Sequence, residues 1–276
     1  MRIKSYSKIN LSLRVINKLK NGMHNIETNS VLINLFDEID ININKKDIIL
    51  FKGRFKNKIN LKNNTIKDTL ALLRKFNIIK KNYKIIIKKN IPAYAGLGGG
   101  TSNSASIVRY FLKNKLNAKL IKAFEQKIGS DFKLFLNNSS FQKNLRQVFK
   151  TQNNINYPLL IVFPNIDCKT KNVYQLVKNF SPQSGSFYLK RLHKNKFINA
   201  IKEDQNDLQK IAERKFLKIF QLIKLIKKQE GCIFSRMTGS GSACYGVFKS
   251  KKTAKFAMTK LKRKCPKYWC VVTKTI

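Results

Sequence analysis

Acidic residues are scarce in this chain of 276 residues: 14 Asp and Glu stand against 57 Lys and Arg, and the formal net charge is +43. Such a balance normally suggests a nucleic acid or an anionic membrane as partner. Here the lysines lie along the whole chain between apolar residues, without a basic tail. Lys, Asn and Ile are over-used together, which indicates compositional drift. Attraction of a polyanionic substrate fits as well, and nucleic acid is the less favoured partner.

Cysteine and histidine are also rare. The five cysteines are odd in number and form no Cys-x-x-Cys pair, which argues against a disulfide framework and against a zinc ribbon. The two histidines, His24 and His193, are too few for a histidine-rich metal site. We therefore expect reduced thiols and assign no metal-ligating residue.

Long apolar runs are missing too. None approaches the roughly 18 residues that a membrane span needs, and residues 1–14 hold no apolar stretch of signal-peptide length. Hydrophobic residues nevertheless make up 43% of the chain, which is enough for a core. We expect a cytoplasmic globular protein with no membrane partner; its length suits one large or two small domains.

Hydrophobic periodicity predicts an α+β protein. Strands are expected at residues 3–15, 31–43, 83–87, 159–163, 233–237, 243–248 and 269–273. Helices are expected at residues 65–76, 101–112, 119–128, 197–201, 210–228 and 253–264. Residues 137–157 are polar and show little periodicity, so we place a domain boundary there and expect domains at 1–150 and 151–276. The β-α-β order of the second half is typical of a ferredoxin-like fold.

The most distinctive feature is a glycine-rich segment that runs into a predicted helix. Four glycines in five residues allow positive φ and close approach of the backbone to a ligand. A helix N-terminus adds unpaired N–H groups and the positive end of the dipole, which together favour phosphate. A flexible surface loop is the simpler alternative. The spacing matches neither a P-loop nor a dinucleotide fingerprint. The candidate phosphate-binding residues are Pro92, Ala93, Tyr94, Ala95, Gly96, Leu97, Gly98, Gly99, Gly100, Thr101 and Ser102.

This segment resembles the ATP-phosphate loop of the GHMP kinases, in the triple-glycine form of the diphosphocytidyl-methylerythritol kinases within that superfamily. Four other segments resemble motifs of the same family, in the same order along the chain. They are Ser7-Lys8-Ile9-Asn10-Leu11, Gly129-Ser130-Asp131-Phe132-Lys133, Asn206-Asp207-Leu208 and Met237-Thr238-Gly239-Ser240-Gly241-Ser242. A single glycine loop would be weak evidence, but several motifs in family order make the resemblance specific.

The resemblance implies a two-domain α+β GHMP kinase fold. The N-terminal domain would be ribosomal-protein-S5-like and the C-terminal domain ferredoxin-like, with the active site between them. It also implies an ATP-dependent kinase that phosphorylates the 2-hydroxyl of a cytidine diphosphate-linked polyol, diphosphocytidyl-methylerythritol, in the non-mevalonate route to isoprenoid precursors. ATP and Mg²⁺ are the expected cofactors, and the hydroxyl of Ser102 or Thr101 is a candidate contact for the ion. Three alternatives stay open: a homoserine- or mevalonate-type kinase, a basic nucleic-acid-binding protein on this fold, and a folded but inactive enzyme.

Two residues match the catalytic positions of the family. Asp131 is the candidate base for the attacking hydroxyl, whereas without the resemblance it would be read as a turn or capping residue. Lys8 is the candidate cation, although a lone lysine in this composition is ordinarily solvated. A cation close to Asp131 would keep its carboxylate ionised. We therefore predict contact between the two side chains.

Further positions match substrate contacts of the family. His24 would bind the edge of cytosine, or be an exposed turn histidine; Tyr174 would stack on the ring. Met23 stands where the family has an aromatic residue and would stack more weakly. The remaining candidates for substrate contact are Asn10, Asn64 and Lys89. Other departures from the family pattern are Ser130, Lys133 and the unmatched residues 144–147.

Overall fold

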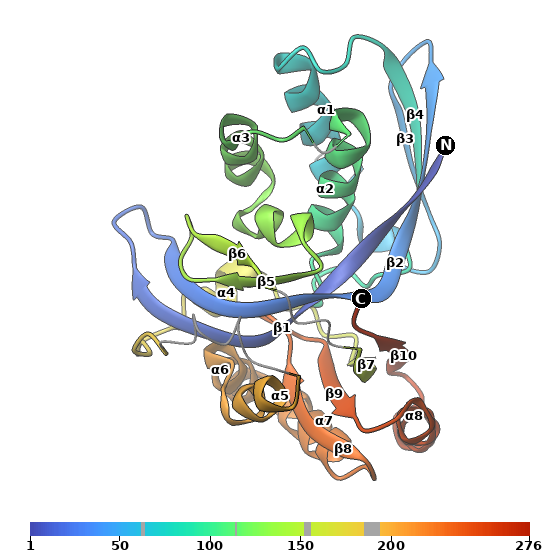
Figure 1. Cartoon of the computed structure of the whole chain (residues 1–276). Helices are drawn as coiled ribbons and strands as arrows, with labels where there is room; N and C mark the ends of the chain where they lie inside the picture. Colours follow the sequence, from blue (N-terminus) through green and yellow to red (C-terminus); the bar gives the residue numbers. More distant parts are fainter. Residues whose placement is uncertain (62–63, 114, 152–155, 185–193) are drawn as a thin grey trace. The chain divides into compact units, whose positions relative to one another are not determined.

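The computed structural model describes residues 1–61, 64–113, 115–151, 156–184 and 194–276 (Figure 1). Its helices and strands form two compact units. Unit 1 comprises Met1–Lys8, Leu35–Ala93 and Gly98–Asn137, and unit 2 comprises Ile9–Asn34, Tyr94–Leu97 and Asn138–Ile276. Two long strands, β1 (Arg2–Lys18) and β2 (His24–Asn44), each contribute residues to both units. The α+β class is confirmed, and the boundary near residue 150 stays a prediction.

Unit 1 combines a strand layer with a helical layer. In the strand layer β4 (Asn82–Lys88) pairs antiparallel with β2 and parallel with β3 (Ile48–Lys52). Alternate β4 residues such as Ile85 and Ile87 are fully buried, as period-2 alternation predicts. The helices pack on one another; they are α1 (Thr65–Lys75), α2 (Gly99–Leu112), α3 (Ala118–Ile128) and the 3₁₀ helix η2 (Ser130–Leu136). A short 3₁₀ helix, η1 (Lys56–Lys58), follows β3.

Unit 2 contains two short strands in the polar segment where we placed the domain boundary. β5 (Ser139–Gln142) pairs antiparallel with the first part of β2, and β6 (Val148–Lys150) pairs with β5. Neither strand was predicted from the sequence. All four β5 residues are buried although three of them are polar, so the strand lacks the apolar alternation by which strands are recognised.

The rest of unit 2 is built on a four-stranded antiparallel sheet in the order β10-β7-β9-β8. Its strands are β7 (Pro158–Phe163), β8 (Cys232–Met237), β9 (Cys244–Phe248) and β10 (Trp269–Lys274). α7 (Leu217–Lys227) packs on β8 and β9, α8 (Lys251–Lys264) packs on β7 and β10, and the two helices contact each other. This is the ferredoxin-like order that the second half predicted.

One helix prediction in unit 2 was wrong. The single helix expected at residues 210–228 is two helices, α6 (Asp207–Lys215) and α7, separated at Phe216. Phe216 has an extended backbone, and its ring packs partly against the core of the unit, so tertiary packing overrides the helical periodicity. The other helices of this unit are α4 (Thr170–Tyr174) and α5 (Lys194–Glu203).

Candidate functional site

The glycine-rich segment forms a loop that opens directly into α2. Gly96 and Gly98 both have left-handed backbones, with φ of +74° and +67°. A side chain at Gly98 would also collide with the Phe135 ring, because an added Cβ would lie 2.5 Å from Cζ. Gly98 is the N-cap of α2 and has no side chain to cap the helix. The N–H groups of the first turn are therefore left for a ligand, and they suit an anion.

The two hydroxyls at the start of α2 are used differently. Ser102 is buried; its Oγ donates to the carbonyl oxygen of Tyr6 and lies 2.7 Å from Ser5 Oγ. Thr101 Oγ1 lies 3.8 Å from the Cβ position of Gly129, the residue that ends α3. Ser102 therefore holds α2 against β1, and Thr101 is the hydroxyl that faces the chain leading to Asp131.

Lys8 and Asp131 meet in unit 1, as predicted. Lys8 Nζ lies 3.4 Å from Asp131 Oδ2, with the lysine side chain 4% exposed and the aspartate 37% exposed. Asp131 stands in the first turn of η2, two residues after Gly129, whose φ of +142° turns the chain out of α3. The Cβ position of Gly98 lies 3.4 Å from Lys8 Cε, so the lysine passes beside the N-cap of α2 on its way to Asp131.

Three residues that were predicted to contact the substrate form contacts within the protein itself. The Lys89 ammonium forms a buried ion pair with Asp37. Asn64 is the N-cap of α1, where its Oδ1 accepts the N–H groups of the first turn. Asn10 is buried in unit 2 and donates from Nδ2 to Thr28 Oγ1 at 2.9 Å. As substrate contacts, all three stay predictions.

The predicted base-binding residues gather in unit 2. The rings of His24 and Tyr174 lie 5.2 Å apart at an interplanar angle of 36°, and the ring of Phe180 lies 6.4 Å from His24. Partial burial lowers the pKa of His24, and the nearby charge of Lys18 lowers it further. The imidazole is therefore biased toward its neutral form, which carries one donor and one acceptor. Met23 is 44% exposed beside this cluster in the chain.

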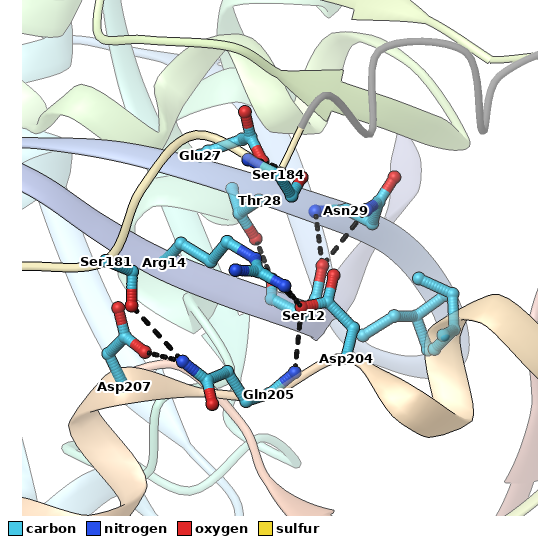
Figure 2. Close-up of polar contacts among 12 residues, drawn as sticks. Ser12, Arg14, Glu27, Thr28, Asn29, Ser181, Ser184, Asp204, Gln205 and Asp207 are labelled. Carbon is cyan, nitrogen blue, oxygen red and sulfur yellow. Dashed lines mark hydrogen bonds and ion pairs between the residues drawn. The ribbon is translucent and has the colours of Figure 1, made fainter.

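The segment that carries Tyr174 and Phe180 is tied to β1 and β2, and Figure 2 shows the side-chain contacts of its Ser181 and Ser184. The N–H of Ser181 donates to the carbonyl oxygen of Val15 at 2.8 Å. Ser184 donates to the buried carboxylate of Glu27 from its backbone N–H at 3.2 Å and from its hydroxyl. Gln205 Nε2 joins Ser181 Oγ to Asp207 Oδ1 in the same cluster. These bonds attach the residues that follow Phe180 to β1 and to β2, the strand that begins at His24.

The C-terminal glycine motif anchors the middle of the glycine-rich loop within unit 2. Thr238 Oγ1 accepts the N–H of Asn10 at 3.0 Å and donates to the Gly96 carbonyl oxygen at 3.3 Å. A Cβ on Gly96 would lie 2.2 Å from the carbonyl oxygen of Thr238, so only glycine fits there. Asn206 Nδ2 donates to the carbonyl oxygens of Met237 and Gly239, both at 2.9 Å. The smaller Asn206-Asp207-Leu208 signature thus supports the motif.

Comparison with known proteins agrees with this geometry. The sequence profile described as "GHMP kinases N terminal domain" matches residues 64–134, and the profile described as "GHMP kinases C terminal" matches residues 189–267. The "4-diphosphocytidyl-2-C-methyl-D-erythritol kinase" of Pelagibacter ubique (strain HTCC1062) is 36% identical over 282 residues, which cover 100% of this chain and 99% of that protein. The chain belongs to the GHMP kinase family.

Other relatives of this GHMP kinase carry the same name. The protein of Wolbachia sp. subsp. Brugia malayi (strain TRS) is 29% identical over 97% of this chain and 96% of its own length. A crystal structure of "4-(cytidine 5'-diphospho)-2C-methyl-D-erythritol kinase" matches with a TM-score of 0.79 at 21% identity and covers 99% of both chains. Homoserine kinase from Cytophaga hutchinsonii matches with a TM-score of 0.69 at 15% identity, over 99% and 96% of the two chains. These solved structures support the GHMP kinase fold.

Two residues of this GHMP kinase site were missed by sequence reasoning. Asp37 lies in an apolar strand and shows no local motif, so nothing in its neighbourhood signalled a partner. Phe180 is 45% exposed and stands before Ser-Pro, an exposed aromatic position that only the structure places beside His24. His193 lies outside the described residues. The part of the chain that the structure describes holds no cluster of three or more His, Cys, Asp or Glu side chains able to bind a metal, and no helix there is long and apolar enough to cross a membrane.

Proposed function

We propose that this GHMP kinase transfers the γ-phosphoryl group of ATP to the 2-hydroxyl of 4-diphosphocytidyl-2-C-methyl-D-erythritol, in the non-mevalonate route to isoprenoid precursors. The observation that carries the reaction type is the Lys8–Asp131 pair at 3.4 Å, with Lys8 passing the uncapped N-terminus of α2. The name shared by the relatives supports the choice of substrate.

Phosphoryl transfer requires a cradle for the nucleotide phosphates, an acceptor for the hydroxyl proton and positive charge near the transferred group. The loop at residues 92–102 is the proposed cradle. The substrate hydroxyl oxygen attacks the γ-phosphorus, the bond from that phosphorus to the bridging oxygen breaks, and ADP leaves. Asp131 takes the hydroxyl proton and Lys8 faces the developing negative charge.

Mg²⁺ would neutralise charge on the nucleotide phosphates. Because Mg²⁺ at such sites is usually held by the phosphates and few protein ligands, the lack of a carboxylate cluster in the described residues fits that arrangement. Thr101 is the better protein contact, since the hydroxyl of Ser102 is already bonded to Tyr6 and Ser5. Thr101 would also place the ion on the side of the loop that faces Asp131.

The cytosine ring would bind in unit 2 at the cluster of His24 and Tyr174, with Met23 beside it. A planar base suits stacking on these rings, and a neutral imidazole can both donate to and accept from the polar edge of cytosine. Asn10 and Asn64 are further proposed contacts of the substrate, whereas the ammonium of Lys89 is already paired with Asp37. No cysteine is needed for this chemistry, and all five are free thiols.

A coupled assay of ADP release tests the proposal. Wild-type protein is given ATP and Mg²⁺ with and without 4-diphosphocytidyl-2-C-methyl-D-erythritol, beside Asp131→Ala and a control variant, Asp68→Ala. Asp68 is another partly exposed carboxylate of unit 1, paired with Lys127 at 3.3 Å. We expect substrate-dependent release that falls about 10²–10⁴-fold in Asp131→Ala and stays near wild type in Asp68→Ala. Folded wild-type protein without substrate-dependent release would refute the assignment.

A further inference from the structure

Asp37 lies on β2 in unit 1, outside every motif that pointed to the site. Its side chain is completely buried, yet its carboxylate accepts four hydrogen bonds. Oδ1 accepts the backbone N–H groups of Asn90 at 2.7 Å and Ile91 at 2.9 Å. Oδ2 accepts Asn103 Nδ2 at 3.1 Å and pairs with the ammonium of Lys89.

These partners stand on both sides of the phosphate loop. Asn90 and Ile91 come directly before Pro92, where the loop begins, and Asn103 comes directly after Ser102, where it ends. One buried carboxylate therefore binds the chain as it enters the loop and again as it leaves within α2. No other acid among the candidate site residues has this relation to the loop.

The first residue of α2 rests on the same cluster. A Cβ on Gly99 would lie 3.0 Å from Ile91 Cγ2 and 3.3 Å from Lys89 Nζ. Ile91 and Lys89 therefore lie against the backbone of Gly99, whose N–H group belongs to the proposed phosphate cradle. The cluster of Asp37, Lys89, Asn90, Ile91 and Asn103 is called the loop clamp below.

A clamp of this kind has a physical role in nucleotide binding. Glycines leave a loop many accessible conformations, and ordering them on binding costs affinity. Holding both ends in the folded protein removes part of that cost and keeps the N–H groups aimed at the anion. A buried carboxylate is a suitable holder because its charge-assisted hydrogen bonds are short and strong.

We infer that Asp37 is a positioning residue for nucleotide binding, which acts by joining the two ends of the phosphate loop, and that Lys89 serves this clamp by pairing with Asp37. The inference rests on the proposed function, because it requires the loop to bind the phosphates of ATP. It also gives Lys89 a role on the nucleotide side of the reaction and not on the alcohol side. Disturbing the clamp should then weaken the binding of ATP and leave the binding of the alcohol substrate unchanged.

The test compares three variants in nucleotide binding and in turnover. Asp37→Asn keeps an oxygen for Asn90 and Ile91 but loses the charge and the acceptor for Asn103. Asn103→Ala removes one hydrogen bond of the clamp and leaves the ion pair intact. Asp47→Asn is the control: Asp47 also accepts a backbone N–H, from Tyr83 at the other end of β4, and pairs with Arg74 at 2.7 Å.

ADP binding with Mg²⁺ is measured by calorimetric titration, and KM is measured separately for ATP and for the alcohol. We expect Kd for ADP and KM for ATP to rise about tenfold in Asp37→Asn and about threefold in Asn103→Ala, the scale of one charged and one neutral hydrogen bond. KM for the alcohol should stay within about twofold. Asp47→Asn should lower Tm without changing either nucleotide constant.

The outcomes separate the two claims. Wild-type protein that binds no ADP would refute the proposed function and the inference with it. Wild-type protein that binds ADP, with variants that lose only thermal stability, would refute the inference alone and leave the clamp a purely structural feature. An equal rise of KM for ATP and KM for the alcohol would also count against the inference. If Asp37→Asn does not fold, Asn103→Ala decides by the same criteria.

Discussion

Lys8 Nζ lies 3.4 Å from Asp131 Oδ2, and the lysine is almost completely buried while the aspartate is partly exposed. A buried ammonium needs a partner, and the carboxylate keeps enough free surface to meet a substrate hydroxyl. Lys8→Met retains the length of the side chain and removes its charge. We expect kcat to fall about 10²–10³-fold with little change in Tm, measured by ADP release and thermal unfolding. Full activity would contradict a role for the charge.

Gly98 and Gly100 are predicted to respond oppositely to alanine. At Gly98 the backbone has φ of +67° and a Cβ would meet the Phe135 ring at 2.5 Å. At Gly100, inside α2, the nearest atom to a Cβ is Thr65 Oγ1 at 3.6 Å. Denaturant titration should show Gly98→Ala destabilised by about 2–4 kcal/mol. Gly100→Ala should be unchanged or up to about 1 kcal/mol more stable.

Tyr174 and Phe180 are predicted to act on the base of the substrate and not on ATP. Both rings lie beside His24, and stacking of a base on an aromatic ring contributes about 1–3 kcal/mol. Alanine at either position should raise KM for the cytidine substrate about fivefold or more and leave KM for ATP unchanged. The control is Phe256→Ala, which removes an exposed ring on α8. An equal rise of this KM in all three variants would show that the effect is not specific to the aromatic residues beside His24.

Asn206 is predicted to stabilise the fold more than an ordinary helix cap. It caps α6 through Leu208 and also donates to the carbonyl oxygens of Met237 and Gly239. Asn117 caps α3 through Leu120, and we use it as the matched control. Asn206→Ala should lower the free energy of unfolding by about 3 kcal/mol, and Asn117→Ala by about 1 kcal/mol. Similar losses would mean that the contacts to the glycine motif contribute little.

The carboxyl group of Glu125 allows a prediction of how thermal stability depends on pH. Burial raises the pKa of its carboxyl despite the opposing ion pair with Lys133 at 2.9 Å. An acid with a raised pKa binds more protons in the folded state, so its contribution is fully present below the unfolded pKa and is lost as pH rises through the folded pKa. Glu125→Gln should therefore raise Tm at pH 7, with the gain disappearing near pH 4. The control is Glu203→Gln, an exposed position, which should change Tm at neither pH. A lower Tm of Glu125→Gln at pH 7 would contradict the predicted direction of the change.

Local signals predicted most of the secondary structure. The helix expected at residues 65–76 is α1, Thr65–Lys75, because its apolar spacing, Asn64 cap and first-turn Asp68 all lie within a few positions of one another. The predicted strands of the second half are present for the same reason. The prediction failed at Phe216, where the core draws one ring inward, and at β5, where polar residues are buried on both faces.

The candidate site, too, was predicted from the sequence only in part. The loop, its positive-φ glycines and the helix start follow from neighbouring residues, and the resemblance to a family supplied Lys8 and Asp131. Ser102 shows the limit: its place in the motif suggested a ligand contact, and the structure uses its hydroxyl to bond Tyr6 and Ser5. A hydroxyl finds its partner among whatever packs around it, which no short segment specifies.

The amino-acid sequence by itself determined the class of fold, the glycine-rich loop and the helix that follows it, because backbone conformation and amphipathic spacing are set by residues close together in the chain. Only the tertiary structure decided which distant side chains meet. Asp37 on β2 binds both ends of the loop, and Phe180 lies beside His24. Such contacts depend on the packing of strands and helices far apart in sequence, since a buried charge or ring takes whatever partner the completed core places within reach.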